Sequence, residues 1–209
     1  MFELVQGEGG VFPLDKEFVQ ELVKICHERD ILVIVDEVQT GIGRTGTLFA
    51  FQQFDIKPDV VSVAKGLGGG LPIGGVICAD TCDTVLSAGL HGSTFGGNPV
   101  SCAAANMVLD TVNTPDFLAE VTAKGNYIRE KIAAMNIPYV TGMRGLGMML
   151  GIGLDGTHTN KVLVAKMVEA GLLCLTAGNN TIRLLPPLTI TYEEIDAGLK
   201  IFEEILKAN

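Results

Sequence analysis

The segments Ile31-Leu-Val-Ile-Val-Asp-Glu37 and Val60-Val-Ser-Val-Ala-Lys65 decide the fold class. Each is a run of mostly β-branched apolar residues that ends in a charged side chain. Runs of this kind are typical of strands in a sheet that is covered on both faces. We therefore expect a parallel sheet whose strands present Asp36 and Lys65 at their carboxyl ends.

Helix-like stretches alternate with these strands along the first half of the chain. Residues 15–30 place apolar side chains on one face, with Asp15 as the expected N-cap, and residues 99–112 form a helix rich in alanine. A further strand is expected over 73–79, and residues 1–5 also have the pattern of a strand. This alternation predicts an α/β fold with right-handed crossover connections.

The second half of the chain has a different pattern. Short strands separated by glycines are expected over 139–142, 148–154 and 181–185, with helices over 116–135, 159–170 and 192–207. We therefore expect two domains. Residues 1–112 form part of a large, doubly wound, mainly parallel domain, and residues 113–209 form a smaller α+β domain.

Composition excludes several classes of protein. The chain has 209 residues, of which 47% are hydrophobic and 19% charged, and its net charge is −9. This hydrophobic content excludes intrinsic disorder, and the acidic charge argues against nucleic-acid and membrane partners. No apolar run approaches the ~20 residues of a membrane span, no signal peptide is visible, and the histidines lack metal-ligand spacing. The five cysteines include no C-x-x-C pair, which predicts reduced thiols in a cytoplasmic protein.

Asp36 and Lys65 are the first candidates for chemistry. Ligands of open α/β sheets bind outside the carboxyl ends of the strands, so both side chains are expected in one partly desolvated crevice. A lysine there can act as a nucleophile and Schiff-base former, and the carboxylate can hold a cation such as a pyridinium. On spacing alone, a solvated lysine and a capping aspartate are the more common explanation. The glycines of residues 66–75 match neither a phosphate loop nor a dinucleotide fingerprint.

Three other features could bind anions or cations. Residues 91–99 are dense in small donors and precede a helix, although a plain loop fits equally well. Arg183 lies within an apolar strand, where a guanidinium is poorly solvated unless it meets a carboxylate or extends its head to water. Glu8 is a carboxylate in a glycine turn, and by itself this position indicates no function.

Taken together, these segments resemble the class III pyridoxal-phosphate aminotransferases of fold type I, most closely the acetylornithine aminotransferase subfamily. The resemblance runs along the whole chain. The motifs that carry it are residues 3–10, 35–46, 58–59 with 64–66, 92–99 and 183–188, and residues 45–50 with 67–74 carry the subfamily likeness.

The resemblance implies a role for each candidate residue with the cofactor pyridoxal 5'-phosphate. Lys65 is expected to form the internal aldimine and to shuttle protons, and Asp36 to pair with the ring nitrogen. Val38 is expected to pack on the ring and Gln39 to hydrogen-bond its phenolic oxygen, with Glu37 also among the cofactor-binding residues. Thr94 is expected to bind the cofactor phosphate of the neighbouring subunit in a homodimer, and Ser93 to lie nearer the substrate. Glu8 and Arg183 are expected to bind the substrate.

The implied reaction transfers the terminal amino group of N2-acetylornithine to 2-oxoglutarate in a ping-pong cycle of arginine biosynthesis. Arg183 is expected to bind the α-carboxylate of glutamate or 2-oxoglutarate, and Glu8 to pair with Arg183 when the other substrate is bound. Ornithine, succinylornithine or 4-aminobutyrate are alternative donors, and a non-catalytic binding module is an alternative of another class.

The resemblance has two departures. Leu4 stands where the family usually has proline. The match covers only the family's carboxyl half, whereas the amino half supplies a phosphate-binding Ser/Gly-Thr loop, an aromatic that stacks on the ring and an arginine for the distal carboxylate. If these 209 residues are the whole chain, we expect them to retain the Schiff-base lysine but not a complete pocket.

Overall fold

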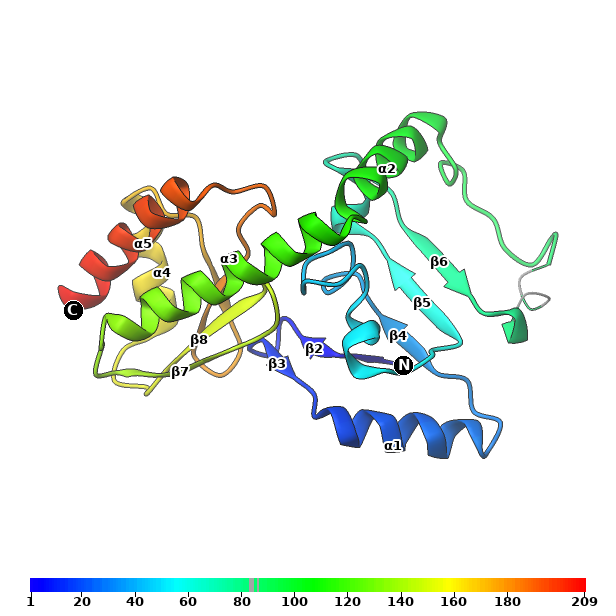
Figure 1. Ribbon diagram of the computed structural model, residues 1–209, viewed down its shortest axis with the longest axis horizontal. Coiled ribbons are helices and arrows are strands. Elements are labelled where there is room, and N and C mark those ends of the chain that lie inside the picture. The colour runs from blue at the N-terminus through cyan, green and yellow to red at the C-terminus, as the bar shows by residue number, and fades with distance from the viewer. Residues whose placement is uncertain (83–84, 86) are drawn as a thin grey trace. The chain divides into compact units, whose positions relative to one another are not determined.

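The computed structural model describes residues 1–82, 85 and 87–209, which form two compact units (Figure 1). The first unit contains residues 1–4 and 14–118, and the second contains residues 5–13 and 119–209. Among the described helices, none combines the length and the apolar character that a membrane crossing requires. The predicted division between residues 112 and 113 stays a prediction about the domains.

The first unit is built on a sheet with the strand order β1-β4-β5-β6. Its strands are β1 (Phe2–Glu3), β4 (Ile34–Asp36), β5 (Val60–Val63) and β6 (Gly75–Cys78). The pairs β1–β4 and β4–β5 are parallel, as expected, whereas β6 is antiparallel to β5. The predicted crossover is missing before β6 because only a short 3-10 turn and a loop connect it to β5, and a parallel return needs a longer connection.

The prediction of a continuous strand over 31–35 is only partly correct. Strand β4 begins later, and Ile31 and Leu32 are about half exposed, at 51% and 50%. The backbone N–H of Val33 donates to the carboxylate of Asp59 at 2.8 Å. At the start of this apolar run, the carboxylate of Asp59 therefore takes the place of a neighbouring strand as the hydrogen-bond acceptor of Val33.

Two helices of the first unit follow the sequence pattern closely. Helix α1 (Lys16–His27) begins after Asp15, whose carboxylate accepts a hydrogen bond from the N–H of Phe18 at 2.8 Å. Helix α2 (Pro99–Val112) begins after Asn98, whose side chain caps the first turn, and it packs on the 3-10 helix that follows β5. The buried residues of this core are Ile42, Val61, Val63, Leu67 and Ala105.

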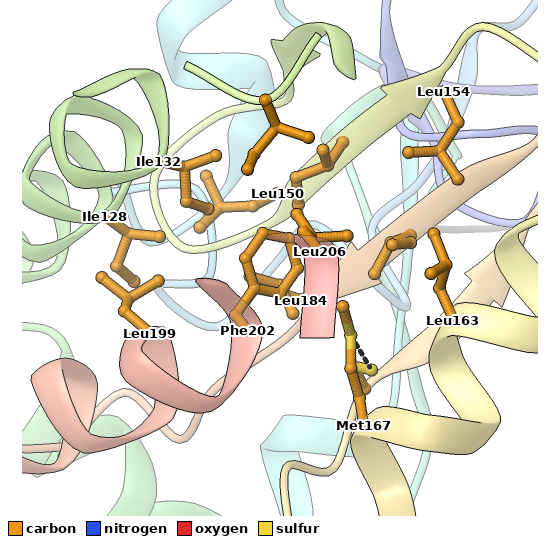
Figure 2. Packing of buried hydrophobic residues seen from close by; sticks show 14 of the residues in the cluster. Ile128, Ile132, Leu150, Leu154, Leu163, Met167, Leu184, Leu199, Phe202 and Leu206 are labelled. Carbon is orange, nitrogen blue, oxygen red and sulfur yellow. Dashed lines mark hydrogen bonds between the residues drawn. The ribbon is translucent and has the colours of Figure 1, made fainter. Parts of the chain in front are cut away.

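The second unit is an antiparallel sheet of order β7-β8-β10-β9 with helices. Strand β8 is buried at every residue, so it lies at the centre of the core. Figure 2 shows how side chains from helices and strands converge there, with Phe202 fully buried. The elements are β7 (Val140–Arg144), β8 (Leu150–Leu154), β9 (Leu175–Ala177), β10 (Thr181–Leu184), α3 (Pro115–Ala134, from Ala119 on), α4 (Asn160–Glu169) and α5 (Tyr192–Lys207).

A small hairpin near the amino terminus belongs to the second unit. It pairs β2 (Val5–Gln6) with β3 (Phe12–Pro13), so the strand expected over residues 1–5 is interrupted at Leu4. The guanidinium of Arg144 donates to the carbonyl of Gly10 at 2.8 Å and lies over the ring of Phe12. These contacts fix the loop that carries Glu8.

Candidate functional site

The end of strand β4 places a carboxylate beside a buried hydroxyl. Asp36 is partly buried, and its Oδ1 accepts a hydrogen bond from the N–H of Val38 at 2.9 Å. The register aligns Asp36 with Ser62 on the parallel strand β5, so the two side chains project from the same face of the sheet. The hydroxyl oxygen of Ser62 is buried and has no hydrogen-bond partner among the described residues. The aligned positions Asp36 and Ser62 thus place a carboxylate and an unsatisfied hydroxyl on one face of the sheet.

Glu37 supports the loop that follows β4. Its side chain is 0% exposed, and its carboxylate accepts hydrogen bonds from the hydroxyl of Thr40, the N–H of Phe51 at 2.9 Å and the N–H of Ala50. Burial raises the pKa of Glu37, although these hydrogen bonds oppose the rise. The carboxylate therefore organises residues 37–54, and the cofactor contact assigned to Glu37 stays a prediction.

Val38 and Gln39 follow at the start of this loop, and both are partly exposed. The loop then turns through Ile42, which has a left-handed φ of 53° although its side chain is buried. A β-branched residue in this conformation costs about 1–3 kcal/mol and persists only where its surroundings hold it in place. The contacts of Glu37 supply part of that support.

Lys65 lies two residues beyond the end of β5 and starts the 3-10 helix Lys65–Gly68. Its φ of 46° lies in the left-handed region, which is strained for a lysine and is common at functional sites. The side chain is exposed, so the partly desolvated position expected from the sequence is not provided by the residues of the first unit. Asp36, the last residue of β4, and Lys65, two residues beyond β5, do however lie at the carboxyl ends of adjacent parallel strands, as predicted.

Ser93 and Thr94 lie in the exposed loop before helix α2. The hydroxyl of Ser93 accepts a hydrogen bond from the N–H of Gly96 at 2.9 Å and so fixes a turn of this loop. Thr94 is exposed next to this turn. The structure thus places both hydroxyls on the surface of the first unit.

The second unit holds the pair formed by Arg183 and Glu8. Arg183 lies on β10 with its side chain only 7% exposed, and its Nη1 donates to Oε1 of Glu8 at 2.7 Å. Glu8 belongs to the loop between β2 and β3, and its side chain is 73% exposed. The loop approaches β8 closely, since a Cβ on Gly151 would lie 2.7 Å from the Cβ of Val11. A buried guanidinium is therefore covered by a carboxylate that faces solvent.

Sequence reasoning missed two residues with roles at these positions, Ser62 and Arg144, and it did not foresee that Glu37 supports the loop after β4. Ser62 could have been found from the strand register, because it is the polar residue within an apolar strand. No set of His, Cys, Asp or Glu side chains suited to a metal ion occurs in the part of the chain that the structure describes.

Comparison with known proteins identifies the family. The pattern of the class III aminotransferases matches residues 1–206. The chain is 49% identical to the acetylornithine aminotransferase of Haemophilus ducreyi over 207 residues, which is 99% of this chain and 51% of that protein. It is 46% identical to the acetylornithine aminotransferase of Bacillus cereus, over 99% of this chain and 53% of that protein. The chain thus spans about half the length of these curated relatives.

Comparison with solved structures also identifies aminotransferases. The N-acetylornithine aminotransferase from Stenotrophomonas maltophilia has a TM-score of 0.90 at 35% identity, with coverage of 99% of this chain and 55% of that one. The ornithine aminotransferase of Plasmodium yoelii also has a TM-score of 0.90, at 33% identity, with coverage of 99% and 56%. These neighbours are fold type I aminotransferases, as the sequence predicted. The chain belongs to the class III aminotransferase family, whose members depend on pyridoxal phosphate.

Proposed function

We propose that this chain is the lysine-bearing part of a transaminase that moves the terminal amino group of N2-acetylornithine to 2-oxoglutarate. The observation that carries the proposal is the placement of Asp36 and Lys65 at the carboxyl ends of two adjacent parallel strands. The carboxyl ends of such strands are where α/β proteins bind their ligands. A carboxylate and a primary amine are the two groups that hold a pyridoxal ring by its nitrogen and its aldehyde.

The residues of the first unit fit pyridoxal phosphate. When bound, this cofactor supplies an aldehyde for amines and a protonated ring that accepts electrons. The carboxylate of Asp36 would keep the proton on the ring nitrogen, because a neighbouring negative charge favours the cationic form. The buried hydroxyl of Ser62 lies on the same face and is able to hydrogen-bond to that carboxylate or to a water beside it. Lys65 would hold the aldehyde carbon and move a proton at the substrate.

The second unit fits a substrate carboxylate. Arg183 would bind the α-carboxylate of glutamate or 2-oxoglutarate in the two-point geometry that guanidinium groups favour. Glu8 would move aside for that ligand and return when the donor, whose amine lies at the end of its chain, is bound. Glu8 is 73% exposed and can return to water, while the incoming carboxylate keeps the guanidinium of Arg183, which is only 7% exposed, paired with a negative charge.

The relatives favour acetylornithine over ornithine as the donor. The curated acetylornithine aminotransferases are 43–49% identical to this chain. Among solved structures the difference is small, with 35% identity to two acetylornithine aminotransferases and 31–33% to the ornithine aminotransferases. Succinylornithine and 4-aminobutyrate stay alternatives within the same class. Because the chain spans about half of its relatives, a binding piece without turnover is the alternative from another class.

We also propose a cytoplasmic homodimer in which Thr94 binds the cofactor phosphate of the neighbouring subunit, with Ser93 nearer the substrate. The exposure of both residues on a loop supports a contact with another chain. Val38 would pack on the cofactor ring and Gln39 would hydrogen-bond its phenolic oxygen. Glu37 would also belong to the cofactor-binding residues, in addition to supporting the loop that carries Val38 and Gln39.

A donor panel tests the proposed reaction. The purified chain is assayed with pyridoxal phosphate, 2-oxoglutarate and each of the four donors, and glutamate formation is measured. The proposal predicts that N2-acetylornithine gives the highest kcat/KM, and that Lys65→Ala abolishes turnover whereas the exposed-lysine control Lys57→Ala does not. Faster turnover with another donor would reassign the substrate. No turnover with any donor would favour the binding piece.

A further inference from the structure

Arg144 and Arg183 project from the same face of the second unit's sheet. The register places Arg144 of β7 and Arg183 of β10 opposite one residue of β8, Gly151. Because aligned residues of neighbouring strands point to the same side, both guanidinium groups rise from one face, on either side of Gly151. Gly151 has no side chain, so the space between the two cations is available to another segment of the chain.

Residues 7–11 form the Glu8 loop, which occupies this space. Val11 is 0% exposed, and its Cβ would lie 2.7 Å from a Cβ on Gly151, so a larger residue there would displace the loop. Three successive carbonyl groups hold the loop in place. They belong to Glu8, which accepts from the N–H of Gly178 at 2.8 Å, to Gly9, which accepts from the side chain of Asn179 at 3.2 Å, and to Gly10, which accepts from Nε of Arg144 at 2.8 Å. The backbone of the loop is therefore fixed, although the side chain of Glu8 is exposed.

Arg144 is itself held in one position. Its Nη2 donates to the hydroxyl of Thr181, and its Cζ lies 4.1 Å from the ring centroid of Phe12. Strand β8 leaves room for the guanidinium, because a Cβ on Gly153 would lie 2.8 Å from Nη1 of Arg144. A guanidinium has several donors in a fixed plane and so binds Gly10 and Thr181 together, whereas a lysine offers a single flexible ammonium. Arg144 thus joins the sheet to the Glu8 loop.

From this geometry we propose that Arg144 is a positioning residue, which holds Glu8 against Arg183 and so sets the preference of Arg183 between two classes of substrate. Because the loop backbone is fixed, Glu8 leaves and regains Arg183 by rotation of its side chain alone. With Nη1 of Arg183 and Oε1 of Glu8 paired at 2.7 Å, the site suits a donor that offers no carboxylate at this point. With Glu8 aside, it suits a carboxylate. This role of Arg144 rests on the proposed function of Glu8 and Arg183.

Loss of Arg144 should shift the affinities for the two substrate classes in opposite directions. The guanidinium of Arg183 is only 7% exposed, and a buried charge without a partner is costly. A misplaced Glu8 leaves Arg183 uncompensated when the amino donor enters, which weakens binding of the donor. The oxo acid 2-oxoglutarate brings its own carboxylate and no longer has to displace Glu8, so it binds more tightly. A purely structural arginine would instead weaken the binding of both.

Titrations of the 209-residue chain with 2-oxoglutarate and with N2-acetylornithine test the proposal. Both are followed by NMR of isotope-labelled arginine side chains, and amide hydrogen exchange of residues 7–11 is measured in parallel. In Arg144→Lys we expect faster exchange, at least about fivefold tighter binding of 2-oxoglutarate and weaker binding of N2-acetylornithine. Thr181→Val removes only the hydroxyl that holds Nη2 of Arg144, in a strand where valine is well tolerated. It should give the same changes to a smaller extent, and it decides the test if Arg144→Lys does not fold.

A double-mutant cycle shows whether Arg144 acts through Glu8. Glu8→Gln removes the competing charge and should by itself tighten the binding of 2-oxoglutarate, and Arg144→Lys should then add nothing further. Arg29→Lys makes the same substitution at an exposed arginine of the first unit and should leave every readout unchanged. Circular dichroism of each variant checks that it is folded.

Three results would overturn the proposal while the proposed function stands. One is native exchange of residues 7–11 in folded Arg144→Lys. Another is a loss of affinity for both ligands, which would identify a structural arginine. The last is equal tightening by Arg144→Lys in the native and the Glu8→Gln backgrounds. If the native chain binds neither ligand, the proposed function of Arg183 fails and the preference fails with it, whereas exchange of residues 7–11 still shows whether Arg144 holds the loop.

Discussion

Replacing Glu37 should destabilise the first unit without affecting the second. The carboxylate is 0% exposed and accepts hydrogen bonds from Thr40, Phe51 and Ala50. Each hydrogen bond to a charged acceptor contributes about 1.5–3 kcal/mol, and burial of the carboxylate offsets several kcal/mol of the total. We therefore expect Glu37→Ala to lower the free energy of unfolding of the first unit by about 2–4 kcal/mol. The control Glu21→Gln, at an exposed helix position, should change it by less than about 0.5 kcal/mol.

The chain contains its own control for this experiment. It has no tryptophan, and its three tyrosines, Tyr127, Tyr139 and Tyr192, all belong to the second unit. Tyrosine fluorescence during urea unfolding therefore reports on the second unit, whereas hydrogen exchange of residues 37–54 reports on the loop that Glu37 supports. Faster exchange in this loop with an unchanged tyrosine transition is the expected result. Native exchange rates in Glu37→Ala, or an equal shift of the tyrosine transition, would refute the reasoning.

The effect of pH on the stability that Glu37 contributes has a defined sign. Burial raises the pKa of Glu37 above its ordinary value of 4.5. The folded state therefore holds this proton at pH values where the unfolded chain has lost it. The associated stability is complete below the unfolded pKa and is lost as the pH rises through the folded pKa. Relative to Glu37→Gln, the native chain should lose stability as the pH rises above 4.5, and a parallel pH profile of the two proteins would contradict this.

Three further predictions follow from other sites. Phe202→Ala removes a fully buried ring from the core of the second unit and should cost about 3–5 kcal/mol in the tyrosine-detected unfolding transition; a cost below about 1 kcal/mol would contradict the packing. Burial raises the pKa of Asp59, but hydrogen bonds from the N–H of Val33 and from His27 and Thr81 outweigh this effect, so the pKa is lowered. The stability that Asp59 contributes should therefore be lost as the pH falls. In Asp59→Asn, this loss of stability in acid should be smaller. Arg183→Ala should raise KM for glutamate and 2-oxoglutarate more than for the amino donor, and an equal loss for both would indicate a structural arginine.

Local signals made much of the fold predictable. Helix α2 was predicted over 99–112 from its run of small residues, and the structure gives the same bounds, with Asn98 as the N-cap. The strand over residues 60–64 was likewise found, because β-branched residues fill it and a charged residue ends it. Asp36 and Lys65 could be placed on one edge of the sheet from strand direction alone.

The features that escaped prediction depend on contacts between distant residues. Ile31 and Leu32 look like strand interior, yet the carboxylate of Asp59 takes over the hydrogen bonding at that point. The hairpin that carries Glu8 consists of two-residue strands, which leave no periodic pattern, and it is held by Arg144 from far along the chain. The exposed amine of Lys65 shows that strand position alone does not determine desolvation.

The most direct test of the account is the reaction of Lys65 with pyridoxal phosphate. The chain is mixed with the cofactor, its absorbance is recorded before and after borohydride reduction, and the lysine-containing peptides are analysed by mass spectrometry. The account predicts a visible band that disappears on reduction and leaves a stable adduct on Lys65, with no adduct there in Lys65→Ala. An adduct confined to other lysines, or equal labelling of Lys57 and Lys65, would contradict the assignment of Lys65 as the cofactor-bearing residue.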